Sequence, residues 1–292
     1  MRKSSGAGSR PPLVSRQVIL ALDGSTRVCG AALVRPDVHG WETVKTRAEV
    51  DGRGQAKLLL PMIDEILTEA GLSPSDIGAV VVGVGPGTFT GVRIAVATAR
   101  ALSLALQVPV AGVGTLSALA AAAAVGAEAA ALPLLVPVVD ARRGQVFFGL
   151  YEAAGLGASG GRWVRRGPFA VCDRSALGEV LGALGVGGAL VLAEDRDLIG
   201  DLPVDVTFAA GAVEAEWLVL GQQLLVEPGE GPEGDRLQPW LATVLREGGR
   251  AVPEVVKPIY VRSPDADIHI TKMRDPWAES PGSPPLEGTP VT

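Results

Sequence analysis

Two acidic residues in the sequence, Asp23 and Asp140, occupy the same kind of position. Each follows a short apolar run and begins a turn, Asp23-Gly24-Ser25-Thr26 in one case and Asp140-Ala141-Arg142-Arg143-Gly144 in the other, after which a second apolar run returns. In such a turn, backbone N–H groups can surround a phosphate while the acid orients metal-bound water. The candidate nucleotide-binding residues are therefore Asp23, Ser25, Thr26 and Asp140, although each turn taken alone is more often only a turn.

The repeated pattern of strand, acid, turn and strand also bears on domain organisation. The two acids lie 117 residues apart, which is the spacing of two domains and not of a solenoid repeat. We therefore expect two related halves.

A second glycine-rich stretch, Gly85-Pro86-Gly87-Thr88-Phe89-Thr90-Gly91, leads into a helix and could hold an anion at the helix N-terminus. It is not a Walker A loop, because no Lys-Ser/Thr follows, and not GxGxxG, because Thr88 stands where the third glycine belongs. Phe89 at its centre also excludes a nucleophile elbow. A tight packing turn with a threonine cap is the commoner explanation. Arg93, a lone cation at the start of the apolar helix, is a candidate either for an interface or for a salt bridge within the domain.

The placement of histidine and cysteine argues against a metal centre. The only histidines, His39 and His269, have no second histidine three or four residues away, as HxxxH and HExxH sites require. The only cysteines, Cys29 and Cys172, form no CxxC, which fits a reducing compartment. We therefore predict no metal ligands, no catalytic residues and a cytoplasmic location.

Charge and hydropathy limit the partners. A net charge of -6 gives no overall field that attracts nucleic acid, so RNA would have to be bound through a partner or a small local patch. Residues 1–16 are basic and lack the apolar run of a signal peptide. The most apolar stretch, 116–139, is interrupted by Gly126, Glu128 and two prolines, which predicts a helix and a buried strand and not a membrane span.

The apolar periodicity predicts an alternating α/β chain. Strands are expected at residues 18–22, 28–34, 41–47, 79–84, 134–139, 145–151 and near 189–193. Helices are expected at residues 55–70, 73–76, about 92–107, 115–124, and near 175–184, 213–226 and 236–246. Residues 259–262 are expected to form a short strand or extended segment. Residues 1–16 and 266–292 are expected to be disordered tails, because they bring little apolar area to offset the entropy of ordering.

Four stretches, taken together, resemble the TsaB (YeaZ) family of the actin/hexokinase-like superfamily. They are residues 19–26 (ILALDGST), 58–64 (LLLPMID), 82–106, which contain GPGTFTGVRIAVATARAL, and 138–147 (VVDARRGQVF). Their order and spacing agree as well, and Pro258-Ile259-Tyr260-Val261-Arg262 resembles the family's C-terminal P-x-Y-x-R element. The chain departs from the family pattern at Gly24, where Thr is common, and at Gln55, where a His often stands.

The resemblance implies an α/β fold of two actin-like (ribonuclease H-like) domains, with mixed sheets flanked by helices and a reduced second domain. The expected domains are residues 17–114 and 115–265, and the C-terminal part of the second is expected to pack back on the first. The implied role is that of a non-catalytic subunit pairing with a TsaD-type transferase for threonylcarbamoylation of the adenosine next to the anticodon in tRNA. The implied interface residues are Leu59, Leu60, Met62, Ile63, Phe89, Arg93, Val96 and Arg100.

The resemblance also implies the other components. A TsaE-type ATPase belongs to the same complex, tRNA is reached only through the complex, a homodimer can form in place of the heterodimer, and no membrane takes part. This chain requires no cofactor, and any ATP or ADP is expected at the partner or at the interface. The histidine pair that holds the metal in TsaD-type proteins is missing from this sequence, which fits a non-catalytic role.

Two other functions stay open at this point. A small actin-fold ATPase or kinase acting alone would need an adenosine-binding loop in the second half, for which Gly185-Val186-Gly187-Gly188-Ala189 is the nearest candidate. A secreted glycoprotease would need metal ligands and a signal peptide, which argues against it. If the chain is a pairing subunit, Arg93→Glu or Ala99→Trp is expected to break pairing without unfolding the chain.

Overall fold

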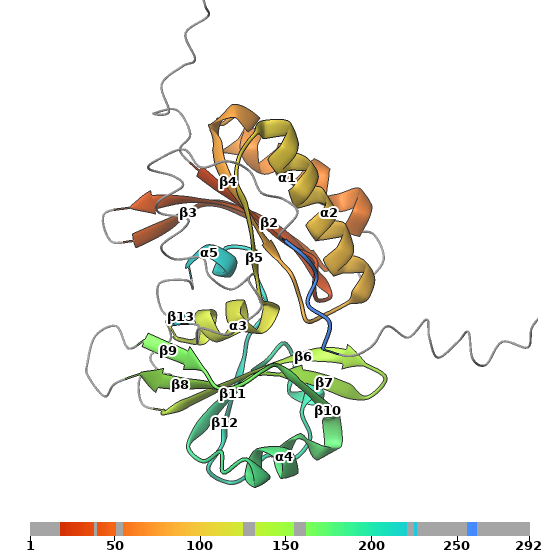
Figure 1. The fold of residues 1–292 in the computed structure, drawn as a ribbon, viewed down its shortest axis with the longest axis vertical. Helices are drawn as coiled ribbons and strands as arrows, with labels where there is room; N and C mark the ends of the chain where they lie inside the picture. Colours follow the sequence, from red (N-terminus) through yellow and green to blue (C-terminus); the bar gives the residue numbers. More distant parts are fainter. Residues whose placement is uncertain are drawn as a thin grey trace, which may run out of the picture. The chain divides into compact units, whose positions relative to one another are not determined.

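The computed structural model describes residues 18–37, 40–50, 55–124, 132–154, 162–220, 225–226 and 256–261 (Figure 1). All of these belong to one compact unit, Met1–Val261, and Arg262–Thr292 is the other unit of the chain. The two tails predicted to be disordered, the predicted helix at 236–246 and both histidines lie outside the described residues.

The first sheet has the strand order β3-β2-β1-β4-β5. The strands are β1 (Val18–Asp23), β2 (Val28–Asp37), β3 (Gly40–Val50), β4 (Ile77–Gly83) and β5 (Val110–Val113). β1, β2 and β3 form an antiparallel meander, and β4 and β5 run parallel to β1. Every residue of β1 and β4 is buried, which explains why these two sequences do not alternate and are apolar except for Asp23 at the end of β1.

Helices α1 (Gln55–Glu69) and α2 (Phe89–Leu106) cover one face of the first sheet (Figure 1). Their buried side chains join one apolar cluster with side chains of β1, β2 and β4. α2 begins earlier than predicted, because the backbone is extended at Thr88 and helical from Phe89 onward. The predicted short helix at 73–76 is a 3-10 turn, η2 (Pro74–Asp76), in which the Ser73 N–H donates to Asp76 Oδ2 at 2.8 Å.

The second sheet is organised around β6 (Leu134–Arg142). β11 (Ala189–Ala193) runs parallel to β6, and β12 (Thr207–Ala210) runs parallel to β11. β7 (Gln145–Phe148) and β8 (Tyr151–Ala154) return antiparallel along β6. The strand predicted at 145–151 is therefore interrupted at Gly149 and Leu150.

The outer strands of the second sheet are β9 (Arg162–Arg165), β10 (Ala170–Asp173) and β13 (Leu225–Val226). The 3-10 turn η4 (Arg174–Ala176) and the helix α4 (Leu177–Ala183) lie between β10 and β11, and a second 3-10 turn, η5 (Arg196–Leu198), lies between β11 and β12. Leu177 and Leu181 of α4 pack with β6 and β11 in a cluster of their own. The predicted helix near 175–184 and the predicted strand near 189–193 are thus present.

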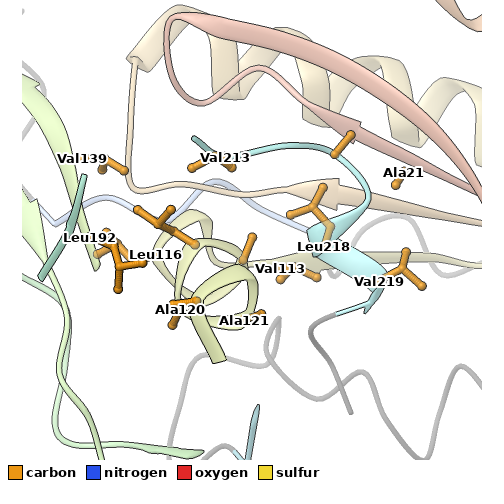
Figure 2. Packing of buried hydrophobic residues seen from close by; sticks show 14 of the residues in the cluster. Ala21, Val113, Leu116, Ala120, Ala121, Val139, Leu192, Val213, Leu218 and Val219 are labelled. Atoms are coloured by element: carbon orange, nitrogen blue, oxygen red, sulfur yellow. The ribbon is translucent and has the colours of Figure 1, made fainter. Parts of the chain in front are cut away.

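A single apolar core connects the two sheets (Figure 2). It is built around α3 (Thr115–Ala124), which contacts β6 and β11 of the second sheet, and α5 (Trp217–Leu220), which contacts β1, β3 and β4 of the first sheet and also α3. Leu116 and Leu218 are fully buried in this core. Of the helix predicted at 213–226, only α5 is helical in the described residues. The two halves therefore share a packed interior.

Among the described residues, α2 is the one helix that is long and apolar enough to cross a membrane. It packs along the first sheet with α1, as a helix of an α/β fold does.

Candidate functional site

The first candidate loop begins with Asp23, the last residue of β1. Asp23 is only 1% exposed. The Ser25 hydroxyl lies 2.9 Å from each carboxylate oxygen of Asp23, and the Ser25 N–H donates to Oδ2 at 3.1 Å. The carboxylate also lies against the backbone of Gly83 at the end of β4, where an added Cβ would overlap Asp23 Oδ1. Asp23 is therefore held by its own turn and by the neighbouring strand.

Burial raises the pKa of the Asp23 carboxyl to about 7, with a smaller contribution from the charge of Glu194, while hydrogen bonds from Ser25 oppose the shift. Near neutral pH the carboxyl is thus partly protonated.

The second glycine-rich loop closes over the Asp23 turn. The Thr88 N–H donates to the Ser25 carbonyl at 2.6 Å, and the Thr88 hydroxyl donates to the Gly24 carbonyl at 3.2 Å. A Cβ at Gly87 would overlap the Ser25 carbonyl oxygen, so this position requires glycine. Within the turn, the Val28 N–H donates to Thr26 Oγ1 at 3.1 Å. The amides of Ser25, Val28 and Thr88 thus have partners inside the protein.

The second candidate acid, Asp140, is ion-paired. The Arg142 N–H donates to Asp140 Oδ1 at 2.8 Å, and the Arg142 guanidinium lies 3.2 Å from Oδ2. Arg174 at the start of η4 approaches Oδ1 at 4.0 Å. These contacts brace the β6–β7 turn, where Arg142 and Arg143 both have positive φ.

Glu194, which directly follows β11, is an acidic residue that the sequence analysis missed. It is the acid whose charge acts on Asp23, and its Oε1 is buried without a hydrogen-bond partner. It could have been found, because it repeats the pattern of an acid directly after a buried strand. The acid that acts electrostatically on Asp23 is therefore Glu194.

The predicted interface residues divide into two groups. Leu59, Met62 and Ile63 of α1 and Val96 of α2 lie in the buried cluster between the helices and the first sheet, so within this chain they are core residues, and their contact with a partner stays a prediction. Their burial follows from the side of each helix that faces the sheet. Leu60 is 56% exposed, Phe89 is 43% exposed, Arg93 is exposed and Arg100 is half-buried.

The outward side of α2 is unusually apolar. Phe89, Arg93, Ala97, Ala101 and Leu104, spaced by three or four residues, are all exposed and follow one side of the helix. We call these five residues the α2 stripe.

Only six of the eighteen residues of α2 are buried, Ala99 among them. The expectation that Ala99→Trp would leave the fold intact is therefore wrong, because the indole would be forced into a packed core.

Comparison with known proteins places these features in a family context. The family model of TsaD, tRNA N6-adenosine threonylcarbamoyltransferase, matches residues 49–158. A crystal structure of an uncharacterized protein with similarity to peptidase YeaZ, from Pseudomonas aeruginosa, superposes with a TM-score of 0.60 at 27% identity, covering 84% of this chain and 100% of that chain. The predicted resemblance to the YeaZ family is confirmed.

A second structure, YeaZ from Pseudomonas aeruginosa, gives a TM-score of 0.58 at 27% identity and covers 84% of this chain and 99% of that chain. No curated protein matches the sequence. The predicted α/β fold with two mixed sheets flanked by helices is also confirmed. Within the part of the chain that the structure describes, no three His, Cys, Asp or Glu side chains gather as a metal site would require.

The buried Asp23 carboxyl predicts a pH dependence. Because its pKa in the folded state lies above the ordinary value of 3.8, the folded chain retains a proton that the unfolded chain releases. The free energy of unfolding should therefore fall as pH rises from about 4 to about 7, by at most about 4 kcal/mol from this group. Asp23→Asn should remove most of this slope, as measured by urea unfolding at several pH values.

Asp76→Asn is the matched control for this measurement. Hydrogen bonds from Ser73 lower the pKa of Asp76, so its contribution to stability is present above its ordinary pKa and is lost only on acidification. An unchanged slope between pH 5 and 7 in Asp23→Asn would contradict the assignment of that slope to Asp23.

Proposed function

We propose that this chain is a non-catalytic subunit that pairs with a TsaD-type transferase in threonylcarbamoylation of the adenosine next to the anticodon in tRNA. A tRNA-modification role is supported by the YeaZ-like fold and by the TsaD family match. The observation that carries the pairing role is the α2 stripe, because its exposed apolar side chains gain burial only through a partner.

The composition of the stripe suits helix-to-helix contact. Ala97 and Ala101 have small side chains that let a second helix approach closely, while Phe89 and Leu104 at the two ends supply larger apolar surface. Leu60 is a further exposed apolar side chain, on the helix α1 that contacts α2. A TsaD-type partner fits, because the family match spans α1, α2 and α3, and related folds can pair through equivalent helices about a pseudo-two-fold axis.

The acidic loops support a role without catalysis by this chain. Asp23 is buried against Gly83 and bonded to Ser25, and Asp140 is ion-paired with Arg142. We infer that this chain requires no cofactor and that ATP or ADP acts at the partner, at the interface or on a TsaE-type ATPase of the same complex. We place the complex in the cytoplasm. We expect tRNA to be bound through the partners, because the chain itself carries a net charge of -6 and does not attract nucleic acid as a whole.

Size-exclusion chromatography with light scattering tests this proposal. The chain is mixed with the TsaD-type protein of its own organism, and each protein is also run alone. We expect a stable complex of one chain with one partner, a homodimer or monomer of this chain alone, and no ATP hydrolysis by this chain alone. Absence of a complex together with ATP turnover by the isolated chain would support a small actin-fold ATPase or kinase instead.

A further inference from the structure

The last described segment, Val256–Val261, is fixed against the first sheet. Val256 is buried in the same cluster as α1 and α2, and the Ile259 N–H donates to the Val84 carbonyl at 2.7 Å. The Ile259 carbonyl oxygen lies close to Gly85, since a Cβ added at Gly85 would be only 3.1 Å from that oxygen. Gly85 also has a φ of +97°, which favours glycine. The segment thus packs against the start of the loop that leads into α2.

This attachment brings Tyr260 to the first turn of α2. The Tyr260 hydroxyl accepts a hydrogen bond from Arg93 Nε at 3.0 Å, and its ring lies 5.8 Å from the Phe89 ring at a tilt of 42°. The Arg93 guanidinium stacks on Phe89, 3.7 Å from the ring centroid, and lies 5.8 Å from the centroid of Tyr260. Three side chains from two distant parts of the sequence therefore form one cluster at the end of the α2 stripe.

The cluster is ordered and yet open to solvent. Tyr260 is 47% exposed and Phe89 is 43% exposed, and Arg93 is also exposed. A free arginine loses much rotamer entropy when a partner binds it, whereas stacking and a hydrogen bond have already restricted Arg93. Tyrosine and arginine are also among the residues that most often dominate binding energy at interfaces.

We propose that Tyr260 is a positioning residue for partner binding, which holds Arg93 flat on Phe89 so that the partner meets a preformed aromatic and cationic surface. This inference rests on the proposed function. The occupant is the TsaD-type chain, presenting an apolar helix surface with a carboxylate opposite Arg93, since Arg93 is the charged member of the α2 stripe.

The positioning itself is tested on the isolated chain by NMR of the arginine Nε–H groups. In the wild type, the Arg93 Nε–H signal should be shifted by the rings and slow to exchange with solvent. Tyr260→Phe should make its exchange faster, because the accepting hydroxyl is lost, while the ring contact stays. An Arg93 signal that is the same in wild type and Tyr260→Phe would overturn the inference.

The effect on binding is tested by calorimetric titration with the TsaD-type protein. Tyr260→Ala should weaken binding about tenfold and Tyr260→Phe less, because the ring is retained. The double variant Tyr260→Ala/Arg93→Ala should bind no more weakly than Arg93→Ala alone, since Tyr260 acts through Arg93. Leu184→Ala, an exposed leucine on α4's C-terminal end, is the control and should bind like the wild type.

The outcomes separate the two claims. If the wild type forms no complex, the proposed function fails and the inference fails with it. If the wild type binds and Tyr260→Ala binds equally well, only the inference is overturned.

Discussion

Leu104→Glu should weaken binding to the TsaD-type partner by at least about a hundredfold. Leu104 is 60% exposed in the isolated chain and closes the C-terminal end of the α2 stripe. In the proposed complex this side chain is buried against the partner, and a carboxylate at that position would have to lose its hydration without a cationic partner. Calorimetric titration of wild type and variant against the same partner measures the loss.

The same substitution should hardly change the free energy of unfolding, because Leu104 is exposed in the isolated chain. Leu184→Glu is the matched control: Leu184 is also an exposed leucine, 47% exposed, and also stands at the C-terminal end of a helix. The unfavourable effect of a negative charge at a helix C-terminus is therefore common to both variants. Equal affinities of Leu104→Glu and Leu184→Glu for the partner would contradict the placement of the interface on α2.

Leu116→Ala should lower the free energy of unfolding by about 2–5 kcal/mol. Leu116 is fully buried on α3 in the core that connects the two sheets, together with Val139 and Leu192 of the second sheet (Figure 2). Removing its side chain leaves a cavity that packed neighbours on both sides cannot close fully. Urea unfolding followed by tryptophan fluorescence and by far-ultraviolet circular dichroism measures the loss.

The shared core also predicts how the chain unfolds. Because side chains of both sheets pack on α3 and α5, the two halves should unfold together, and both signals should give one coincident transition in wild type and variant. Leu184→Ala serves as the exposed control and should cost less than about 0.5 kcal/mol. Two separate transitions would show that the halves are independent, and a loss below about 1 kcal/mol would show that Leu116 is not in a tightly packed core.

The local pattern of the sequence predicted most strands and helices, because apolar runs and turn residues are local signals. β1 and β4 were recognisable as continuous apolar runs, and Asp23 was recognisable as the first residue of a turn. The break between β7 and β8 was not, since it depends on how the chain pairs along β6.

The side of each helix that packs against the sheet could not be predicted in the same way. α1 and α2 carry apolar residues on more than one side, so periodicity alone does not say whether Leu59 or Leu60 meets the sheet. The structure buries Leu59 and exposes Leu60, and in α2 it buries Ala99 and exposes Ala101. The sheet, which lies elsewhere in the sequence, makes that choice.

Long-range contacts explain the remaining omissions. In the sequence, Tyr260 stood out only as part of a C-terminal motif. Its hydrogen bond with Arg93 could not be predicted, because 167 residues separate the two. The raised pKa of Asp23 depends on burial against β4 and on Glu194, which follows β11. Such relations arise from the packing of distant segments, which a single sequence does not display.

The most direct test of the pairing account is amide hydrogen exchange of this chain, alone and in the presence of the TsaD-type partner. We predict that the partner slows exchange in peptides covering α1, α2 and Val256–Val261, while β11, β12 and α4 exchange as in the free chain. Slowed exchange confined to β11, β12 and the Asp140 turn, with α2 unchanged, would contradict the account.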